Sequence, residues 1–233
     1  MKKNRSEIRR VGVFGGTFNP IHYGHLHIAR EAQRLFSLSQ VYFVVATSPP
    51  HKEPESLIPF THRYAMVSLA TSAVSSFIPS LAELEPEPSP FSVDTIAKFA
   101  RRFSGEGIVL YFIAGGDSLP EVNSWRESRK LLNLCNFIFA VRPGADFADP
   151  GGVLHRGAAA RLRNLTGLGL NQIRRRIARE DPADRRIYIV DVGAPDISAT
   201  EIREMACAGR PIRRLVPDNV REYISKLHLY GAR

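Results

Sequence analysis

Short runs of consecutive apolar residues alternate along the chain with segments in which apolar residues recur every three or four positions. The runs predict six strands that are buried on both faces, at 11–14, 41–45, 77–81, 109–114, 137–141 and 187–192. The periodic segments predict helices at 25–36, 61–74, 93–103 and 128–134. Because strands that alternate with helices form βαβ units, we expect an α/β fold, a doubly wound parallel sheet with helices on both faces.

A short C-terminal helical part, 198–230, is predicted after the last strand. Ser198 and Glu201 have the spacing of a capping box at the start of its first helix, and a second helix begins near Pro217. No internal repeat is present. We therefore predict a single domain over 1–233.

Positive charge is concentrated in two segments. The 233 residues include 32 Lys and Arg against 23 Asp and Glu, a formal net charge of +9. Five of the basic residues lie in the first ten positions, and we interpret 1–9 as a basic leader. A further nine arginines lie in 155–186, within a Gly-, Ala- and Arg-rich stretch at 145–186 that we interpret as an insertion. The segment 155–186 contains no aromatic residue, which favours a solvated helix over a nucleic-acid-binding surface.

The composition excludes several classes of protein. The two cysteines, Cys135 and Cys207, are too few for a disulfide framework and lack the spacing of a zinc site. No segment approaches the roughly 20 apolar residues of a membrane span. The apolar run after the basic leader breaks at Gly15, too early for a signal peptide. We expect a cytoplasmic protein with no membrane partner.

The loop after the first predicted strand has the most distinctive chemistry. Residues 15–25 are Gly-Gly-Thr-Phe-Asn-Pro-Ile-His-Tyr-Gly-His. Gly15 and Gly16 let the backbone approach a phosphate chain, and the helix that follows presents unpaired N–H groups to an anion. His22 and His25 could both donate hydrogen bonds to that anion, although an isolated His-x-x-His is more often ordinary packing. The G-x-G-x-x-G dinucleotide fingerprint is absent, which disfavours an oxidoreductase.

This string, G-G-T-F-x-P-I-H-x-G-H, resembles the phosphate-binding motif of the nucleotidyltransferase superfamily. More narrowly, it is similar to that of the bacterial nicotinate-nucleotide adenylyltransferases of NAD biosynthesis. Members commonly carry Asp where this chain has Asn19. The resemblance covers about 11–142 and 187–230 and implies a Rossmann-like sheet. It also implies an ATP site that includes Gly15, Gly16, Thr17, Phe18, His22 and His25.

Two further motifs follow other strands. Arg203 lies in the first turn of the helix after the last strand, where the helix dipole disfavours a cation unless an anion also binds. Ser198, Thr200 and Arg203 match the family's I-S-S/A-T-x-x-R motif, which there holds the ATP triphosphate. Lys52 lies in a segment similar to the family's P-P-H-K, which there faces the substrate.

The fourth strand is followed by Gly115, Asp117 and, eight residues later, the single tryptophan, Trp125. Asp117 could accept hydrogen bonds from ribose hydroxyls. Trp125 could stack on an aromatic base, although a single Trp is usually part of the core. The segment is similar to the family's G-x-D-x-L…W pattern, in which the Trp stacks on the pyridine ring.

The stretch 90–96 bears on whether the acceptor is an acid or an amide. Ser92 is predicted to be a helix N-cap, and the N–H groups after it could bind the carboxylate that nicotinate has and nicotinamide lacks. The stretch resembles the family's S-Y-T-x-x-T-L, with Phe91 replacing Tyr and Ser92 replacing Thr. Arg142 matches a family arginine that lies near the substrate phosphate.

The resemblance implies an enzyme that transfers the adenylyl group of ATP to nicotinate mononucleotide, in line and without a covalent intermediate. The products are nicotinate adenine dinucleotide and pyrophosphate. His22, His25 and Arg203 are the expected catalytic residues, and Mg²⁺ is expected to arrive with ATP rather than at a protein metal site. Alternatives are transfer to nicotinamide mononucleotide or another phosphorylated acceptor, a nucleic-acid-binding module and a catalytically inactive binding protein. The sequence leaves monomer and homodimer open.

Overall fold

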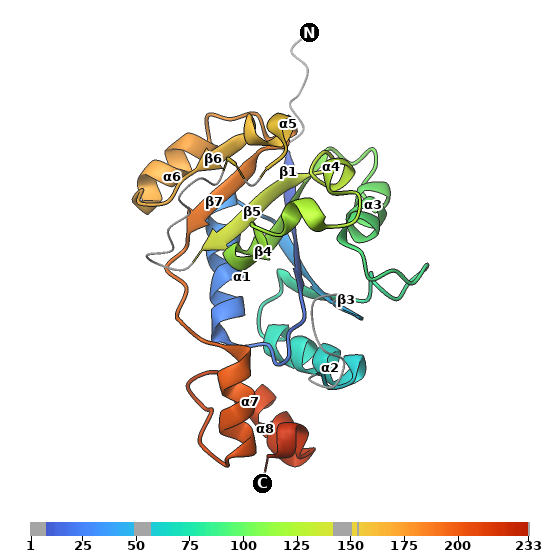
Figure 1. Ribbon diagram of the computed structural model, residues 1–233, viewed down its shortest axis with the longest axis vertical. Coiled ribbons are helices and arrows are strands. Elements are labelled where there is room, and N and C mark those ends of the chain that lie inside the picture. Colours follow the sequence, from blue (N-terminus) through green and yellow to red (C-terminus); the bar gives the residue numbers. More distant parts are fainter. Residues whose placement is uncertain (1–7, 49–56, 142–150, 153, 233) are drawn as a thin grey trace.

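The computed structural model describes residues 8–48, 57–141, 151–152 and 154–232. Within them, seven strands form one all-parallel sheet in the order β3-β2-β1-β4-β5-β7-β6 (Figure 1). The strands are β1 (Arg9–Gly16), β2 (Gln40–Val45), β3 (Phe77–Ser80), β4 (Ile108–Gly115), β5 (Asn136–Val141), β6 (Leu162–Asn164) and β7 (Ile187–Asp191). The prediction of a doubly wound parallel sheet is confirmed, and the six predicted strands are all present.

The helices connect the strands and pack on both faces of the sheet. They are α1 (Tyr23–Phe36), α2 (Phe60–Thr71), α3 (Ser92–Arg102), α4 (Ser128–Leu131), α5 (Arg156–Ala159), α6 (Leu170–Ile177), α7 (Ala199–Cys207) and α8 (Asp218–Lys226). The four predicted helices between strands correspond to α1, α2, α3 and α4.

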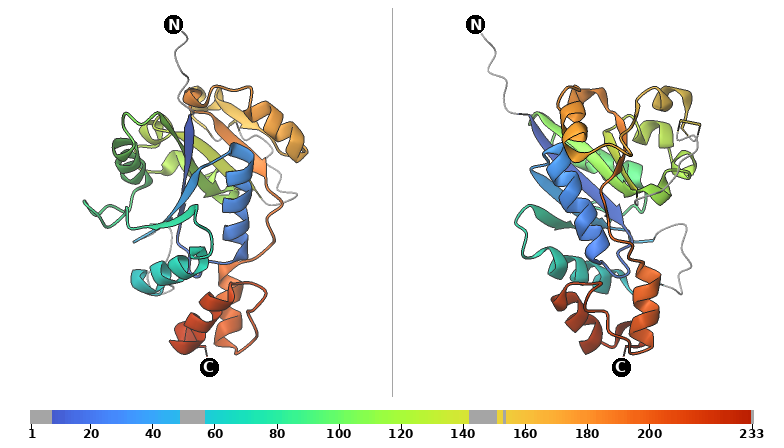
Figure 2. Two further views of the ribbon diagram at one scale, coloured as in Figure 1. Left: turned by 180° about the vertical axis from the view of Figure 1, so that it is seen from behind. Right: turned by 90° about the vertical axis from the view of Figure 1, so that its left-hand side faces the viewer.

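Alternate residues of each strand enter two separate cores. In β1, Val11 and Val13 belong to the core shared with α3, α4 and α5, whereas Phe14 belongs to the core shared with α1, α2 and α6. Figure 2 shows α1 and α4 on opposite sides of the sheet. Because both faces are covered, the central strands have apolar residues at consecutive positions, as the hydropathy pattern indicated.

The order of the strands creates a switch point between β1 and β4. The chain runs from β1 outward through β2 and β3, and then returns to the other side of β1 as β4. Phe14 of β1 pairs with Ile113 of β4, so the loops that follow Gly16 and Gly115 leave the same edge of the sheet side by side. Ligands of doubly wound sheets bind at such a point.

The C-terminal helices α7 and α8 lie beyond this edge of the sheet (Figure 1). The Tyr23 N–H donates to the Leu215 carbonyl at 2.9 Å, and the Asn219 amide donates to the Leu69 carbonyl at 2.7 Å. These bonds fix the C-terminal part against the start of α1 and the end of α2. Ser198 is the N-cap of α7 as predicted, but its side chain makes no capping hydrogen bond, so the predicted capping box does not form.

The Arg-rich stretch is more ordered than an insertion loop. Its described part contains α5, β6 and α6, and β6 extends the sheet by pairing with β7. The prediction missed β6 because its three residues, Leu-Arg-Asn, include a single apolar side chain. Ile173 and Ile177 of α6 are buried, whereas Leu170 is 42% exposed.

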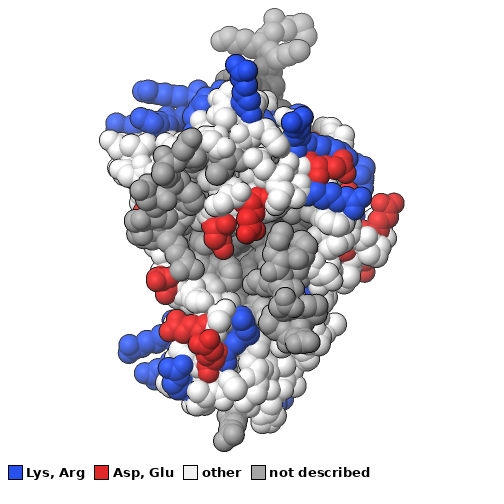
Figure 3. All heavy atoms as spheres, viewed as in Figure 1, with Lys and Arg blue, Asp and Glu red and all other residues white. Residues whose placement is uncertain are grey.

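The arginines of α6 and its C-terminal end are exposed, namely Arg174, Arg175, Arg176 and Arg179. Figure 3 shows Lys and Arg side chains around this end of the molecule and a second group at the opposite end, where Figure 1 has α7 and α8. None of the described helices combines the length and the apolar composition that crossing a membrane requires.

Candidate active site

The loop after β1 is shaped by the Phe18 side chain. Phe18 is 1% exposed, and its ring packs edge-on against Phe14 at a centroid distance of 5.5 Å. A Cβ at position 16 would lie 2.8 Å from the Phe18 ring, so only glycine fits there. Phe18 has a φ of 48°, a left-handed conformation that a bulky residue keeps only when its surroundings hold it.

His25 caps the first turn of α1 with its side chain. The His22 backbone N–H donates to Nδ1 of His25 at 3.3 Å. The two rings lie 3.7 Å apart between centroids, with an interplanar angle of 30°. Because Nδ1 of His25 is an acceptor, the proton of the neutral ring is on Nε2. The His-x-x-His spacing therefore sets the tautomer of His25 and makes its Nε2 a donor.

Arg203 connects the last motif to the first. Its Nη1 donates to the Asn19 carbonyl at 3.0 Å, and its Nη2 donates to the Thr200 hydroxyl at 3.2 Å. The Tyr230 hydroxyl also reaches this loop and donates to Oδ1 of Asn19 at 2.9 Å. Burial raises the pKa of Tyr230, so the phenol keeps its proton. Segments 184 and 211 residues apart thus meet at Asn19, three residues before His22.

The other side of the switch point carries Asp117, in a 3-10 turn (Gly116–Ser118) directly after β4. Its side chain is exposed and folds back over Gly115, where a Cβ would collide with the carboxylate. A Cβ at position 116 would lie 2.5 Å from the Val141 side chain and 3.2 Å from the Ala140 carbonyl. Glycine at 116 therefore lets the turn lie directly against β5.

Trp125 and the start of α3 lie next to each other. Trp125 is half-buried, and its ring is perpendicular to Phe112 at a centroid distance of 6.1 Å. The guanidinium of its neighbour Arg126 lies 4.4 Å from the centroid of the Phe91 ring. One part of the Trp125 ring therefore packs on the core while another part remains accessible.

The prediction that Ser92 is an N-cap is wrong by one residue. Phe91 is the N-cap of α3, and Ser92 is the first helical residue. Ser89 makes the polar contacts here, accepting from the Phe91 N–H at 3.3 Å and donating to the Asp94 carboxylate at 2.7 Å. The Asp94 and Thr95 amides bond to the Phe91 carbonyl. The Asp94 amide therefore makes the first hydrogen bond of the helix, and the Ser92 and Val93 amides come before it in the chain.

Comparison with known proteins agrees with this geometry. A family model described as cytidylyltransferase-like matches residues 13–205. The protein named probable nicotinate-nucleotide adenylyltransferase in Thermoanaerobacter sp. (strain X514) is 38% identical, over 95% of this chain and 94% of its own. Its namesake in Geobacter metallireducens is 37% identical, over 95% and 98%. The chain belongs to the nicotinate-nucleotide adenylyltransferase family.

Solved structures of nicotinic acid mononucleotide adenylyltransferases share the fold. The Plasmodium falciparum protein of that name, solved in complex with NaAD, has a TM-score of 0.68 at 18% identity and covers 97% of this chain and 98% of its own. The same protein in complex with APC gives a TM-score of 0.67. At this identity the likeness supports the Rossmann-like architecture expected for the family.

The structure places most of the residues that the family motifs indicated at one edge of the sheet. The first group comprises Gly15, Gly16, Thr17, Phe18, His22, His25, Ser198, Thr200 and Arg203, and the second comprises Phe91, Ser92, Gly115, Asp117 and Trp125. Lys52 and Arg142 lie outside the described residues.

The sequence analysis missed Arg63, Glu83 and Tyr230. Arg63 and Glu83 are buried, at 1% and 7% exposed, and together they contact the ends of β1 and β2. The hydropathy pattern could have indicated Arg63. Met66 and Val67 follow it at helical spacing, so Arg63 lies on the apolar face of α2. A cation on an apolar helix face needs buried acceptors.

Proposed function

We propose that this protein transfers the adenylyl group of ATP to nicotinate mononucleotide, a step of NAD biosynthesis. The products are nicotinate adenine dinucleotide and pyrophosphate. The observation that carries the proposal is the meeting of Arg203 with the Asn19 carbonyl beside the His22 and His25 pair. This arrangement gathers cationic and neutral donors at the switch point, where an anionic nucleotide binds. Membership of the family supports the same activity.

The proposed reaction is a direct displacement. A phosphate oxygen of nicotinate mononucleotide attacks the α-phosphorus of ATP, a new P–O bond forms, and the bond to the β-phosphate breaks to release pyrophosphate. The attacking group belongs to the substrate, so no protein nucleophile is required. The protein contributes positioning and stabilisation of the charge that develops on the leaving group.

We assign the triphosphate to the first group of residues. His22 and His25 donate to oxygens of the α- and β-phosphates, and the His25 tautomer places the required hydrogen on Nε2. Ser198, Thr200 and Arg203 hold the departing pyrophosphate. A guanidinium has five N–H donors, so the two bonds to Asn19 and Thr200 leave Arg203 with donors for an anion. Gly15, Gly16, Thr17 and Phe18 supply the backbone wall, and Lys52 adds a cation.

We assign nicotinate mononucleotide to the second group. The accessible part of Trp125 stacks on the pyridine ring, and Asp117 after Gly115 accepts from the ribose hydroxyls. The start of α3 at Phe91 and Ser92 binds the nicotinate carboxylate through the backbone amides of its first turn. Arg142 contacts the substrate phosphate. The shift of the N-cap to Phe91 preserves this role, because the first-turn amides remain at the start of the helix.

Mg²⁺ belongs to the proposed reaction as part of the Mg-ATP substrate, where it neutralises phosphate charge. In the described part of the chain, no three His, Cys, Asp or Glu side chains come together as metal ligands.

The test is pyrophosphate release from Mg-ATP, measured in parallel with nicotinate mononucleotide and nicotinamide mononucleotide. We expect pyrophosphate release that requires both ATP and an acceptor, with nicotinate mononucleotide used much more efficiently than nicotinamide mononucleotide. Equal use of acid and amide would retain the chemistry but remove the carboxylate role of α3. Release with neither would contradict the proposal, and phosphopantetheine would then be the next acceptor to test.

A further inference from the structure

Arg63 is a buried cation that contacts the residues directly after β1 and β2, at the edge of the sheet where the candidate site lies. It is 1% exposed, and its partners are backbone carbonyl oxygens. Nη1 donates to Thr17 at 2.9 Å and to Ala46 at 2.6 Å, Nη2 donates to Thr47 at 3.2 Å, and Nε donates to Ile58 at 3.1 Å. One side chain of α2 therefore joins the loop after β1, the end of β2 and the segment that leads into α2.

Glu83 holds the same peptide from the other side. Its Oε2 accepts from the Thr47 N–H at 2.7 Å and from the Thr47 hydroxyl at 3.1 Å. The carbonyl of Thr47 is bonded to Arg63 and its N–H to Glu83, so this residue lies between a buried cation and a buried carboxyl group. Burial raises the pKa of Glu83, and the two hydrogen bonds from Thr47 and then the charges of Arg63 and Lys98 oppose that rise.

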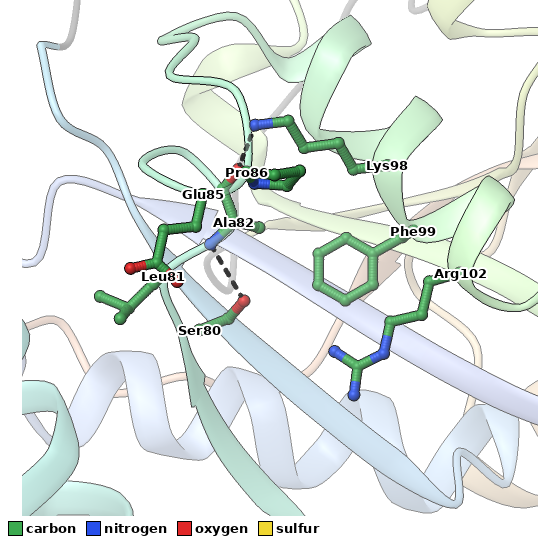
Figure 4. A pocket seen from close by; sticks show the side chains of 8 residues that line it. All are labelled: Ser80, Leu81, Ala82, Glu85, Pro86, Lys98, Phe99 and Arg102. Carbon is green, nitrogen blue, oxygen red and sulfur yellow. Dashed lines mark hydrogen bonds between the residues drawn. The ribbon is translucent and has the colours of Figure 1, made fainter.

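The segment that carries Glu83 is anchored by α3. Lys98 donates to the Ala82 carbonyl at 2.7 Å and to the Glu87 carbonyl, and the Ala82 N–H donates to the Ser80 hydroxyl at 3.3 Å. Figure 4 shows the bonds of Ala82 to Lys98 and Ser80. They lie beside a cavity of about 580 Å³ between this segment and α3. Glu83 therefore belongs to a fixed segment.

We propose that Arg63 and Glu83 are positioning residues that align the loop after β1 for the triphosphate of ATP. This inference rests on the proposed function. The Thr17 carbonyl that Arg63 holds directly precedes Phe18, whose left-handed backbone turns the chain toward Asn19 and His22. The Ala46 N–H bonds to the Gly16 carbonyl at 2.9 Å, so the contacts of Arg63 set both sides of this turn.

A guanidinium is well suited to this position. The carbonyl oxygens of Thr17, Ala46, Thr47 and Ile58 converge, and their partial negative charges repel one another unless a cation with several donors lies between them. Lysine keeps the charge, but its three donors radiate from one atom and cannot reproduce the planar fork. Arg63→Lys therefore tests geometry with charge retained, and Arg63→Met removes both.

The experiment compares Arg63→Lys, Arg63→Met and the wild type in steady-state pyrophosphate release, with the folded fraction measured by circular dichroism. We expect Arg63→Lys to lower kcat/KM for ATP by roughly 10- to 100-fold per folded molecule, the effect of misplacing reacting groups by about 1 Å. The KM of this variant for nicotinate mononucleotide should change less than about twofold. Arg63→Met should lower kcat/KM for ATP further than Arg63→Lys does. Arg34→Lys is the matched control, because Arg34 makes its ion pair with Glu31 within α1 and not with the backbone that Arg63 holds.

Unchanged kinetics per folded molecule, or equal changes for both substrates, would overturn the proposal and leave Arg63 a purely structural role. If the Arg63 variants do not fold, Glu83→Gln and Thr47→Val carry the test, since each weakens the Glu83 contact with little change in volume. Both variants should lower kcat/KM for ATP, but by less than Arg63→Lys is expected to. An unchanged kcat/KM for ATP in both variants would overturn the proposal.

Direct binding of a non-hydrolysable ATP analogue separates this proposal from the proposed function. A wild type that binds the analogue without releasing pyrophosphate contradicts the proposed reaction alone. Weaker analogue binding by Arg63→Lys would then still support the positioning role, and equal binding would overturn it. A wild type that neither binds the analogue nor releases pyrophosphate contradicts both.

Discussion

The loops after β1 and β4 leave the sheet side by side, yet the two are held differently. On the β1 side, the loop is bonded to α2 through Arg63, to α7 through Arg203 and to the C-terminus through Tyr230. On the β4 side, Asp117 is exposed, and Trp125 is half-buried with its ring perpendicular to Phe112. We call these the triphosphate side and the acceptor side, according to the proposed substrates.

The difference matches what each substrate group requires. Charge develops on the phosphates during adenylyl transfer, and donors stabilise it best when they are fixed in place beforehand. A pyridine ring and a ribose bind through a flat surface and exposed acceptors, which need less support. Under the proposed function, we therefore expect the chemistry on the side with cross-links between distant segments and substrate recognition on the side with accessible groups.

The largest effect is expected on the triphosphate side, from His25→Ala. Loss of the Nε2 donor should lower kcat at least about 100-fold, the order of magnitude for a lost transition-state hydrogen bond. Steady-state pyrophosphate release at saturating substrates measures it. His62→Ala is the control. His62 is also a histidine, but it bonds to the Tyr223 hydroxyl of α8 at 3.0 Å and does not belong to the loop after β1. A His25→Ala enzyme with normal turnover would remove the distinction between the two sides.

A smaller effect is expected on the acceptor side, from Trp125→Ala. Loss of stacking, worth about 1–3 kcal/mol per base, should raise the KM for nicotinate mononucleotide about tenfold or more and leave the KM for ATP within about twofold. Trp125→Phe should retain part of the affinity. Thermal unfolding is measured on the same variants. A lowered Tm with unchanged KM values would mean that Trp125 is a core residue through its Phe112 contact.

The smallest effect concerns stability, and it tests whether the triphosphate side is supported by a buried carboxyl group. Burial raises the pKa of Glu83 above its ordinary value of about 4.3. The stability that Glu83 contributes is therefore fully present below the unfolded pKa and is lost as pH rises through the folded pKa. Relative to Glu83→Gln, the wild type should lose unfolding free energy on going from about pH 4 to neutral pH, by less than about 1.4 kcal/mol per pH unit.

Denaturant unfolding of both proteins across this range measures that difference. A difference between the two proteins that does not vary with pH would show that the pKa of Glu83 is the same in the folded and unfolded states.

Local sequence patterns predicted most of the fold because the central strands are buried on both faces. Their consecutive apolar residues are visible without knowledge of their neighbours, as in 137–141, which corresponds to β5. The strand β6 lies at the edge of the sheet and needs no such run, so its three residues left no signal. The N-cap of α3 is Phe91 and not Ser92 as predicted. Ser89 makes the local hydrogen bonds at this helix start, to Phe91 and Asp94.

The sequence by itself determined the succession along the chain of the six strands buried on both faces and of the helices between them, and the residue types at the ends of β1, β4 and β7. Those properties depend on hydropathy over a few positions and on short motifs such as His22-x-x-His25. Only the tertiary structure decided that Arg63 is buried and that Arg203 meets Asn19. The acceptors of both arginines come from segments distant in sequence, and their convergence exists only once the sheet has assembled.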